Sequence, residues 1–184
     1  MKNQIIALVG MCGSGKSIAT EILENRGYKK VYFGGVTMEK LKEEGLEVNE
    51  TNERMIREQL RKDYGMAAYA VVSIPRIKEY IKEGNVVIDG LYSWDELKAL
   101  RETFDDLITV ICVVTDKKIR CERLAKREIR PLTKEQVDSR DISEIENLAK
   151  GGPIAYADYF IDNNGNLEDY RKRLDNILKE VGKD

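Results

Sequence analysis

The stretch Gly10-Met11-Cys12-Gly13-Ser14-Gly15-Lys16-Ser17 decides the fold of this 184-residue chain. It fits the pattern G-x-x-x-x-G-K-[ST] in full, and it stands between the apolar run Ile5–Val9 and a helical pattern that begins at Ile18. A loop of this kind between a strand and a helix is typical of phosphate binding. Its glycines let backbone N–H groups curl around an anion, and the following helix N-terminus adds partial positive charge.

Each part of this loop has an expected role. We expect Lys16 to reach the β- and γ-phosphates of ATP and the Ser17 hydroxyl to ligate Mg²⁺. The Cys12 side chain is expected to be passive, since the backbone holds the phosphates. The residues predicted to bind the nucleotide here are Gly10, Met11, Cys12, Gly13, Ser14, Gly15, Lys16, Ser17 and Ile18.

A second strand-like segment supplies a carboxylate for the metal. The segment NVVIDGLYS (85–93) is apolar up to Asp89. An aspartate at the end of a strand can hold Mg²⁺ directly or through water, or it can simply cap a turn with Gly90. The phosphate loop favours the first interpretation, so we predict a metal site formed by Ser17 and Asp89.

Composition narrows the function classes. The 31 Lys and Arg residues nearly balance 33 Asp and Glu, so no net charge attracts nucleic acid or an anionic membrane. The chain has no histidine, which removes Ser-His and Cys-His mechanisms and His-ligated metal sites. Three irregularly spaced cysteines and no signal-peptide pattern lead us to expect a cytoplasmic protein. The longest apolar run, Leu107–Val114, is too short to span a membrane.

The order of the segments predicts an α/β fold of three layers. The Ile- and Val-rich runs are nearly continuous, as in parallel strands covered on both faces. Capping-box spacing marks two helix starts, at Ser93 and Thr133. We expect strands at 4–10, 29–33, 85–89, 107–114 and 158–162, and helices at 15–26, 36–45, 50–64, 66–83, 94–103, 116–128, 134–149 and 167–181. We expect one domain over 1–184, with a helical acceptor-side insertion at about 36–83 and a lid at about 123–149.

The segment DKKIRCERLAKREIRP (116–131) is rich in basic residues. Arg123 and Arg127 share a helix face at i, i+4 spacing, and Arg side chains suit phosphate oxygens or stack on a nucleobase. A solvated helix face is the alternative. Pro131 breaks the segment, which indicates a mobile lid that brings arginines over the reacting phosphates. The predicted catalytic residues are Lys16, Arg127, Arg130 and Arg140.

These segments resemble the nucleoside-monophosphate-kinase superfamily of P-loop kinases, and most of all the archaeal adenylate-kinase-related and dephospho-CoA-kinase-like proteins. The resemblance covers nearly the whole chain and rests on the phosphate loop, VVIDGLYS (86–93), ERLAKR (122–127) and ADYFIDNNG (157–165). It implies a five-stranded parallel sheet of order 2-3-1-4-5 with Mg-ATP as donor. It also implies that Arg123 packs on the ATP base, that Arg127 faces phosphates, and that backbone near Asn163 and Gly165 lies beside the adenine.

The acceptor side departs from that superfamily. Gly35 and Met38 stand where an aspartate and an arginine are usual, and Tyr92 replaces a substrate arginine. Gly34-Gly35 lets a ligand approach closely but offers no carboxylate base, which favours an acceptor phosphate that is already anionic. The remaining acceptor-binding candidates are Arg54, Arg57 and Arg61, which share helix faces at i, i+3 and i, i+4 spacing, and Arg76.

Three functions remain open at this point. The first is a kinase that acts on a small-molecule phosphate acceptor, a nucleoside monophosphate before dephospho-CoA. The second is a nucleotide-gated regulatory or binding ATPase, suggested by the unusual acceptor side. The third is a structural protein that has kept a vestigial loop.

Overall fold

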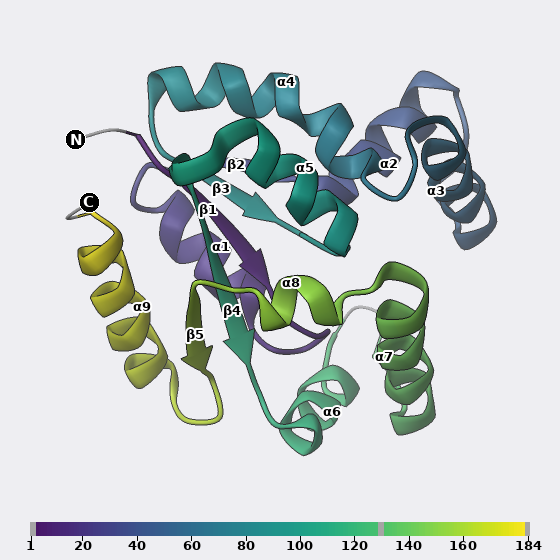
Figure 1. Ribbon diagram of the computed structural model, residues 1–184. Coiled ribbons are helices and arrows are strands. Elements are labelled where there is room, and N and C mark those ends of the chain that lie inside the picture. Colours follow the sequence, from purple (N-terminus) through teal and green to yellow (C-terminus); the bar gives the residue numbers. More distant parts are fainter. Residues whose placement is uncertain (1–2, 129–130, 183–184) are drawn as a thin grey trace.

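Five parallel strands form the centre of the computed structural model, which describes residues 3–128 and 131–182 (Figure 1). The strands are β1 (Ile5–Val9), β2 (Lys29–Tyr32), β3 (Val86–Asp89), β4 (Ile108–Val114) and β5 (Tyr159–Asp162). Their order is β2-β3-β1-β4-β5, which confirms the predicted α/β fold and its 2-3-1-4-5 sheet.

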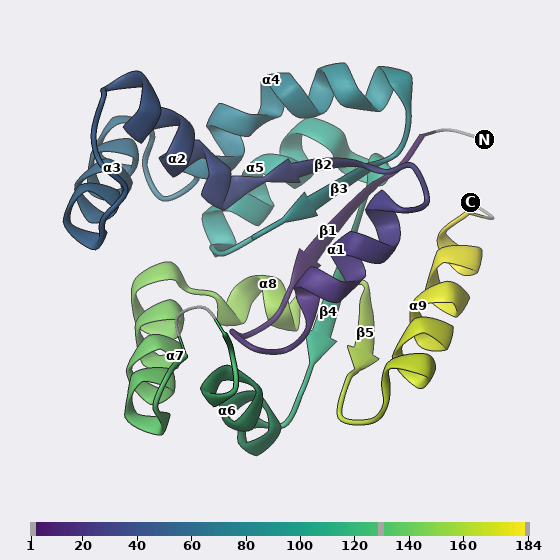
Figure 2. The same cartoon turned by 180° about the vertical axis from the view of Figure 1, so that it is seen from behind.

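Helices cover both faces of this sheet. Figures 1 and 2 show α1 and α9 on one face, with α4, α5 and the short α8 on the other. The helices are α1 (Lys16–Glu24), α2 (Phe33–Glu43), α3 (Glu50–Tyr64), α4 (Ala68–Glu83), α5 (Trp94–Phe104), α6 (Lys117–Ala125), α7 (Lys134–Leu148), α8 (Gly151–Ala155) and α9 (Leu167–Val181), and a 3₁₀ turn spans Asp105–Leu107.

The central strand β1 explains the continuous apolar runs of the sequence. All five residues of Ile5–Val9 are completely buried. Ile5, Ala7 and Val9 pack toward the α4–α5 layer, while Ile6 and Leu8 pack toward α1 and α9. Because both faces of the strand are covered, alternation with polar residues is absent, and each buried Ile or Leu stabilises the fold by about 1.5–3 kcal/mol.

The two predicted capping boxes are present. Ser93 accepts a hydrogen bond from the Glu96 N–H at the start of α5, and Thr133 does the same with Gln136 at the start of α7. The Glu96 carboxylate in turn accepts from the Ser93 N–H at 3.0 Å. These caps fix where both helices begin, close to the carboxyl edge of the sheet.

Several elements differ from the sequence-based expectation, most clearly at α2, α6 and α8. Helix α2 begins at Phe33, so Gly34 and Gly35 lie in its first turn and not in an open loop. Two glycines disfavour a helix, but complete burial of the Phe33 side chain holds this turn in place. Helix α8 was not expected, because Gly151-Gly152-Pro153 is typical of a loop. Helix α6 ends at Ala125, three residues early.

The carboxyl ends of the strands meet at one edge of the sheet. There, Tyr32 of β2 pairs with Asp89 of β3, and Asp89 pairs with Leu8 of β1. Helices α2 and α3 lie beside one part of this edge, and α6 and α7 beside the other (Figure 1). Such an edge is where ligands bind in open α/β sheets.

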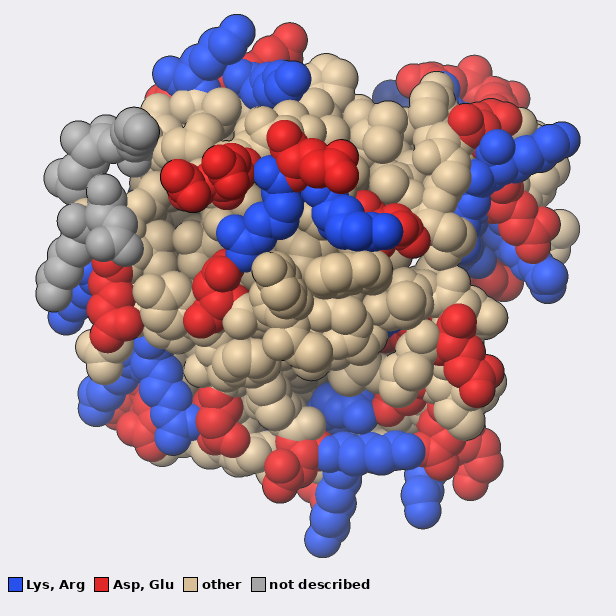
Figure 3. Space-filling model, in the orientation of Figure 1, with Lys and Arg blue, Asp and Glu red and all other residues tan. Residues whose placement is uncertain are grey.

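The charged side chains form no large single-sign patch on the face shown in Figure 3, where basic and acidic groups are interspersed. Within residues 3–128 and 131–182, no helix combines the length and the apolar character needed to cross a membrane.

Candidate active site

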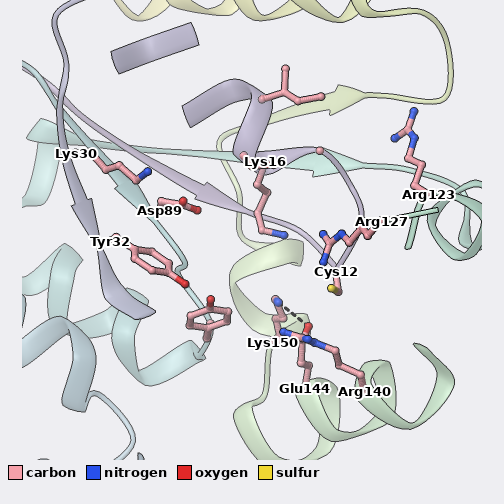
Figure 4. A pocket seen from close by; sticks show the side chains of 15 residues that line it. Cys12, Lys16, Lys30, Tyr32, Asp89, Arg123, Arg127, Arg140, Glu144 and Lys150 are labelled. Atoms are coloured by element: carbon pink, nitrogen blue, oxygen red, sulfur yellow. Dashed lines mark hydrogen bonds and ion pairs between the residues drawn. The ribbon is translucent and has the colours of Figure 1, made fainter. Parts of the chain in front are cut away.

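A cavity of about 440 Å³ lies at the carboxyl edge of the sheet. Its lining comes from the phosphate loop, β2, β3, α6, α7 and the turn before α8, so segments far apart in the sequence converge there (Figure 4). The lining residues are Cys12, Gly13, Gly15, Lys16, Ser17, Ile18, Lys30, Tyr32, Asp89, Tyr92, Arg123, Arg127, Arg140, Glu144 and Lys150.

Side chains from the surrounding elements hold the carbonyl groups of the phosphate loop. Arg120 donates to the Cys12 carbonyl at 3.0 Å. The Asn163 amide and the Thr115 hydroxyl both donate to the Ser14 carbonyl, at 2.7 and 2.9 Å. The Tyr170 hydroxyl donates to the Gly15 carbonyl at 3.1 Å. Since α1 begins at Lys16, its first N–H groups have no partner within the helix and can bind an anion.

Two glycines of the loop have no possible substitute. Gly10 has φ +144°, and a Cβ there would lie 2.4 Å from the Val113 carbonyl oxygen. Gly15 has φ +105°, and a Cβ there would lie 2.1 Å from the Asn163 amide nitrogen. The glycines of the motif therefore supply both left-handed conformations and room for the groups that hold the loop.

Lys16 has its ammonium group inside the loop. Its Nζ donates to the carbonyl oxygens of Gly10 and Met11, at 2.7 and 3.0 Å. Burial, together with the nearby charge of Lys150, lowers the pKa of Lys16 to about 8. A desolvated ammonium ion held by two neutral carbonyls is well placed to gain a stronger partner when a phosphate enters the cavity.

Ser17 and Asp89 line the same cavity and fit a magnesium site. Burial raises the pKa of Asp89, and the charges of Lys30 and Lys16 oppose that shift. Among the residues that the structure describes, no group of three or more His, Cys, Asp or Glu side chains is arranged to hold a metal ion. A Mg²⁺ ion at this place would need phosphate oxygens of a ligand beside the one carboxylate and the one hydroxyl, and the site stays a prediction.

The predicted lid arginines reach the cavity from α6, from the segment that follows α6, and from α7. Arg123, Arg127 and Arg140 all line it. The Arg123 Nη2 donates to the Asn163 carbonyl at 2.8 Å, while its Nη1 is buried without a hydrogen-bond partner among the described residues. Arg130, the fourth predicted arginine of this group, lies outside the described residues.

Asn163 and Gly165, the two residues predicted to lie beside the adenine, differ in how deeply they are buried. Asn163 is buried, and its side chain holds the phosphate loop from behind. Gly165 is exposed, and a Cβ added there would meet nothing within 4 Å. Their predicted contact with the adenine stays a prediction.

Three of the four predicted acceptor arginines lie on α3, and the fourth lies on α4. Arg54 pairs with Glu58 at 2.8 Å, and Arg57 pairs with Glu50 at 2.7 Å. Arg61 also lies on α3, and Arg76 on α4 pairs with Glu39 at 2.9 Å. None of the four is among the residues that line the described cavity.

Lys150 and Glu144 line the cavity but were not singled out from the sequence. The Lys150 side chain is almost completely buried, and its Nζ donates to Glu144 at 2.6 Å. Burial alone would raise the pKa of Glu144, but the ion pairs with Lys150 and Arg140 hold it below its usual value. The i, i+4 spacing of Arg140 and Glu144 was the one sequence signal for this cluster.

Tyr32 occupies the space that the two glycines of α2 leave open. A Cβ at Gly34 would lie 2.4 Å from the Tyr32 hydroxyl oxygen, so the tyrosine ring folds back over the start of α2. In this conformation the Tyr32 side chain occupies the place at Gly34 where a ligand was expected to approach the backbone, so that expectation stays a prediction. Tyr32 lines the cavity at the end of β2, together with Lys30.

Sequence comparisons find relatives of nearly equal length. The family model described as "AAA domain" matches residues 6–146. A "UPF0200 protein" from Thermococcus kodakarensis is 34% identical over 181 residues, which cover 96% of this chain and 97% of that protein. Another from Thermococcus gammatolerans is 33% identical over 181 residues, which cover 96% of this chain and 95% of that protein.

Solved structures share the fold at low sequence identity. A protein from Thermus thermophilus has a TM-score of 0.69 and 18% identity over 98% of both chains. A shikimate kinase from Bacteroides thetaiotaomicron has a TM-score of 0.60 and 12% identity over 97% of this chain and 98% of its own. A dephospho-CoA kinase from Campylobacter jejuni has a TM-score of 0.56 and 16% identity over 98% of both chains. The fold is that of P-loop kinases.

Proposed function

This chain belongs to the UPF0200 family, and we propose that it transfers the γ-phosphate of Mg-ATP to a small molecule that itself carries a phosphate, with nucleoside monophosphates as the substrate class. The observation that carries this proposal is the cavity, where the phosphate loop, the carboxylate of Asp89 and the arginines of α6 and α7 converge. Phosphoryl transfer needs mainly positioning and charge neutralisation, which this set of groups can provide.

The residues have separate roles in the proposed reaction. The phosphate loop binds the β- and γ-phosphates, and Lys16 moves its ammonium from the loop carbonyls to a phosphate oxygen. Ser17 and Asp89 would hold Mg²⁺, which neutralises charge on the phosphate oxygens when bound. Arg127 and Arg140 stabilise the charge that spreads over the transferred group, and the segment 123–149 acts as the lid that carries them.

The bond changes require no strong base. The bond between the γ-phosphorus and the oxygen that bridges it to the β-phosphate breaks, and an oxygen of the acceptor phosphate forms the new bond to phosphorus. The products are ADP and the acceptor diphosphate. An acceptor phosphate is anionic at neutral pH, and this agrees with Tyr32, not a carboxylate, at the end of β2. A hydroxyl acceptor such as dephospho-CoA would require Asp89 to serve both as base and as metal ligand.

A regulatory ATPase is the second candidate, because the predicted acceptor arginines of α3 do not line the cavity. The two candidates differ in whether an acceptor is needed. We expect ADP release from Mg-ATP to rise at least tenfold on addition of one of AMP, CMP, GMP or UMP. Lys16→Ala protein, purified in parallel, corrects for contaminating ATPases. Stimulation by dephospho-CoA alone would favour the hydroxyl kinase, and hydrolysis that no acceptor stimulates would favour the regulatory ATPase.

A further inference from the structure

Lys150 is a buried cation that the proposed roles leave unused. Its side chain is only 1% exposed, although an ammonium ion is costly to bury. Glu144 accepts from its Nζ at 2.6 Å and also from the Arg140 Nε at 3.2 Å. Two cations thus share one carboxylate, so the cluster of Arg140, Glu144 and Lys150 keeps a net positive charge at the cavity wall.

The backbone before Lys150 adopts an uncommon conformation that aims this side chain inward. Helix α7 ends at Leu148, and the cap residue Ala149 has φ +50° and ψ +39°, the left-handed region that disfavours residues other than glycine. The conformation costs about 1–2 kcal/mol at a residue other than glycine, and it ends the helix as a left-handed C-cap, so the chain turns sharply at Lys150. Just beyond, Gly152 lies so close to Trp94 that a Cβ would come within 2.8 Å of its ring. The turn is therefore held by packing on α5.

Lys150 lies on the β2–β3 side of the cavity, opposite the predicted adenine contacts. Its Nζ is 5.0 Å from the centre of the Tyr92 ring, which follows Asp89 in the chain. Arg123, by contrast, is bonded to Asn163 beyond the end of β5. Figure 4 shows Lys16 and Lys150 pointing into the same space, with Asp89 to the left of Lys16 in that view. A group between the two ammonium ions would lie next to the γ-phosphate.

The charge of the cavity leaves room for a second anion. Among the described lining residues, six are cations (Lys16, Lys30, Arg123, Arg127, Arg140 and Lys150) and two are carboxylates (Asp89 and Glu144). Mg-ATP brings about two net negative charges to this excess of cations. A phosphomonoester, with a charge of about −1.5 to −2 at neutral pH, would compensate most of the remainder.

We propose that Lys150 binds the phosphate of the acceptor and that Glu144 is a positioning residue that orients it, so that the acceptor anion enters between Lys150 and Lys16 and not at α3. This assignment rests on the proposed function for the identity of the acceptor. Glu144 has a low pKa and two cationic partners, so it stays ionised and does not act as a general base. It competes with the acceptor phosphate for Lys150.

The competition between Glu144 and the acceptor phosphate predicts effects of opposite sign. Binding of AMP, CMP, GMP and UMP is measured by calorimetry on protein saturated with Mg²⁺ and a non-hydrolysable ATP analogue, and the matching nucleosides serve as probes without phosphate. For the monophosphate that binds best, Lys150→Met should weaken binding at least tenfold and leave the nucleoside within twofold. Glu144→Gln should tighten the same monophosphate at least threefold. A purely structural pair would instead weaken binding in both variants.

Two further variants keep the test decisive. The variant Lys150→Met alone leaves the Glu144 carboxylate buried without its lysine and can unfold for that reason. The double variant Glu144→Gln with Lys150→Met removes both charges and avoids this problem. This double variant should show the same loss of monophosphate binding. Lys98→Met, an exposed lysine of α5 paired with Asp95, is the matched control and should bind like wild type.

The remaining outcomes separate this inference from the proposed function. If the monophosphate binds through Lys150 but ADP release is not stimulated, the site is correct and the kinase activity is wrong. If turnover is stimulated but the variants bind the monophosphate like wild type, Lys150 is not the acceptor site. Two other results would also overturn the inference. The first is that Lys150→Met weakens binding of the ATP analogue but not of the monophosphate. The second is that no monophosphate binds the wild-type complex with a Kd below about 1 mM, which corresponds to ~4 kcal/mol.

Discussion

The phosphate loop and the proposed acceptor side of the cavity are built in opposite ways. The loop is one continuous stretch, Gly10–Ser17, and neutral and charged donors from α6, from Asn163 just after β5 and from α9 hold its carbonyl groups. The acceptor side takes single residues from β2, β3, α7 and the turn before α8. Ion pairs hold it, most clearly the one between Lys150 and Glu144.

This difference has a physical consequence. Backbone groups and helix termini recognise any phosphate chain of the right shape, so one local motif suffices for the donor. Ion pairs within a cavity can be exchanged for a ligand charge, so they can select an acceptor without a fixed motif. The ATP-binding half of the cavity, formed by Gly10–Ser17, can therefore be predicted from the sequence. The proposed acceptor half, formed around Lys150 and Glu144, is assembled only when the chain folds.

The largest effect is expected from the buried ion pair between Arg120 and Asp141, which supports the phosphate loop. Arg120 and Asp141 are almost completely buried, with a guanidinium–carboxylate contact of 2.7 Å, and Arg120 also holds the Cys12 carbonyl. Arg120→Met leaves Asp141 buried without its partner, so we expect a loss of about 3–5 kcal/mol in the free energy of unfolding. Urea unfolding measures it. Changing both residues to apolar ones should recover much of this loss; equal stability of wild type and Arg120→Met would contradict the buried pair.

Removing the loop ammonium tests the donor half without disturbing its frame. Lys16→Ala should lower kcat/KM for ATP by on the order of 10²–10³, or about 2.7–4 kcal/mol, because it removes a cation aimed at the phosphates. Steady-state ADP release gives the rate, and circular dichroism checks that the fold is retained. ATP binding and turnover at wild-type levels in this variant would remove the donor site from the loop.

The lid arginines Arg123 and Arg127 test both the phosphate-loop side and the proposed acceptor side of the cavity, because they line the cavity between the two. Arg123→Ala should mainly raise the KM for ATP, since Arg123 lies beside Asn163 and is predicted to pack on the base. Arg127→Ala should mainly lower kcat, because its partner charge grows in the transition state. We expect about 1.5–3 kcal/mol for each. Small and equal effects on both parameters would indicate a solvated helix face.

The pH dependence separates Lys16 from the arginines. With a pKa of about 8, Lys16 is charged below that pH and neutral above it. We expect kcat/KM for ATP to be flat below pH 8 and to fall toward tenfold per pH unit above it, or ~1.4 kcal/mol. Lys16→Arg should remove this limb if it retains activity. The lowered pKa of Lys16 also affects stability. Between pH 8 and the ordinary lysine pKa of 10.5, Lys16 is protonated in the unfolded chain and neutral in the folded one, so the free energy of unfolding increases as the pH rises through this range.

The smallest effects are expected on α3. Arg54 and Arg57 already pair with glutamates and do not line the cavity, so replacing either with alanine should change the acceptor KM less than about twofold, within ±0.5 kcal/mol. Arg61→Ala belongs to the same series. A tenfold rise in acceptor KM with unchanged ATP affinity in any of them would restore the assignment made from the sequence.

Much of the fold was predictable because its signals are local. The eight residues of the phosphate loop carry their own conformational requirements, seen in the left-handed Gly10 and Gly15. Apolar runs such as Ile5–Val9 identify buried strands, and capping boxes at Ser93 and Thr133 mark helix starts within four residues of sequence. The sheet order came from the resemblance to P-loop kinases, and the structure confirms it.

Only the tertiary structure showed the buried cluster of Lys150 and Glu144 and the side chains that support the loop. The residues around Lys150 in the sequence do not predict that Ala149 adopts a left-handed conformation and directs the Lys150 side chain into the cavity. They also do not predict the ion pair between Lys150 and Glu144. Arg120 is one of several basic residues on α6, and only the packing of α6 on α7 buries it against Asp141. By itself, the sequence determined the sheet and the phosphate loop, since their causes act over a few neighbouring residues. The buried charge partners lie 6 and 21 residues apart along the chain, and the side chains that hold the loop lie more than a hundred residues from it, so these distances exist only in the folded chain.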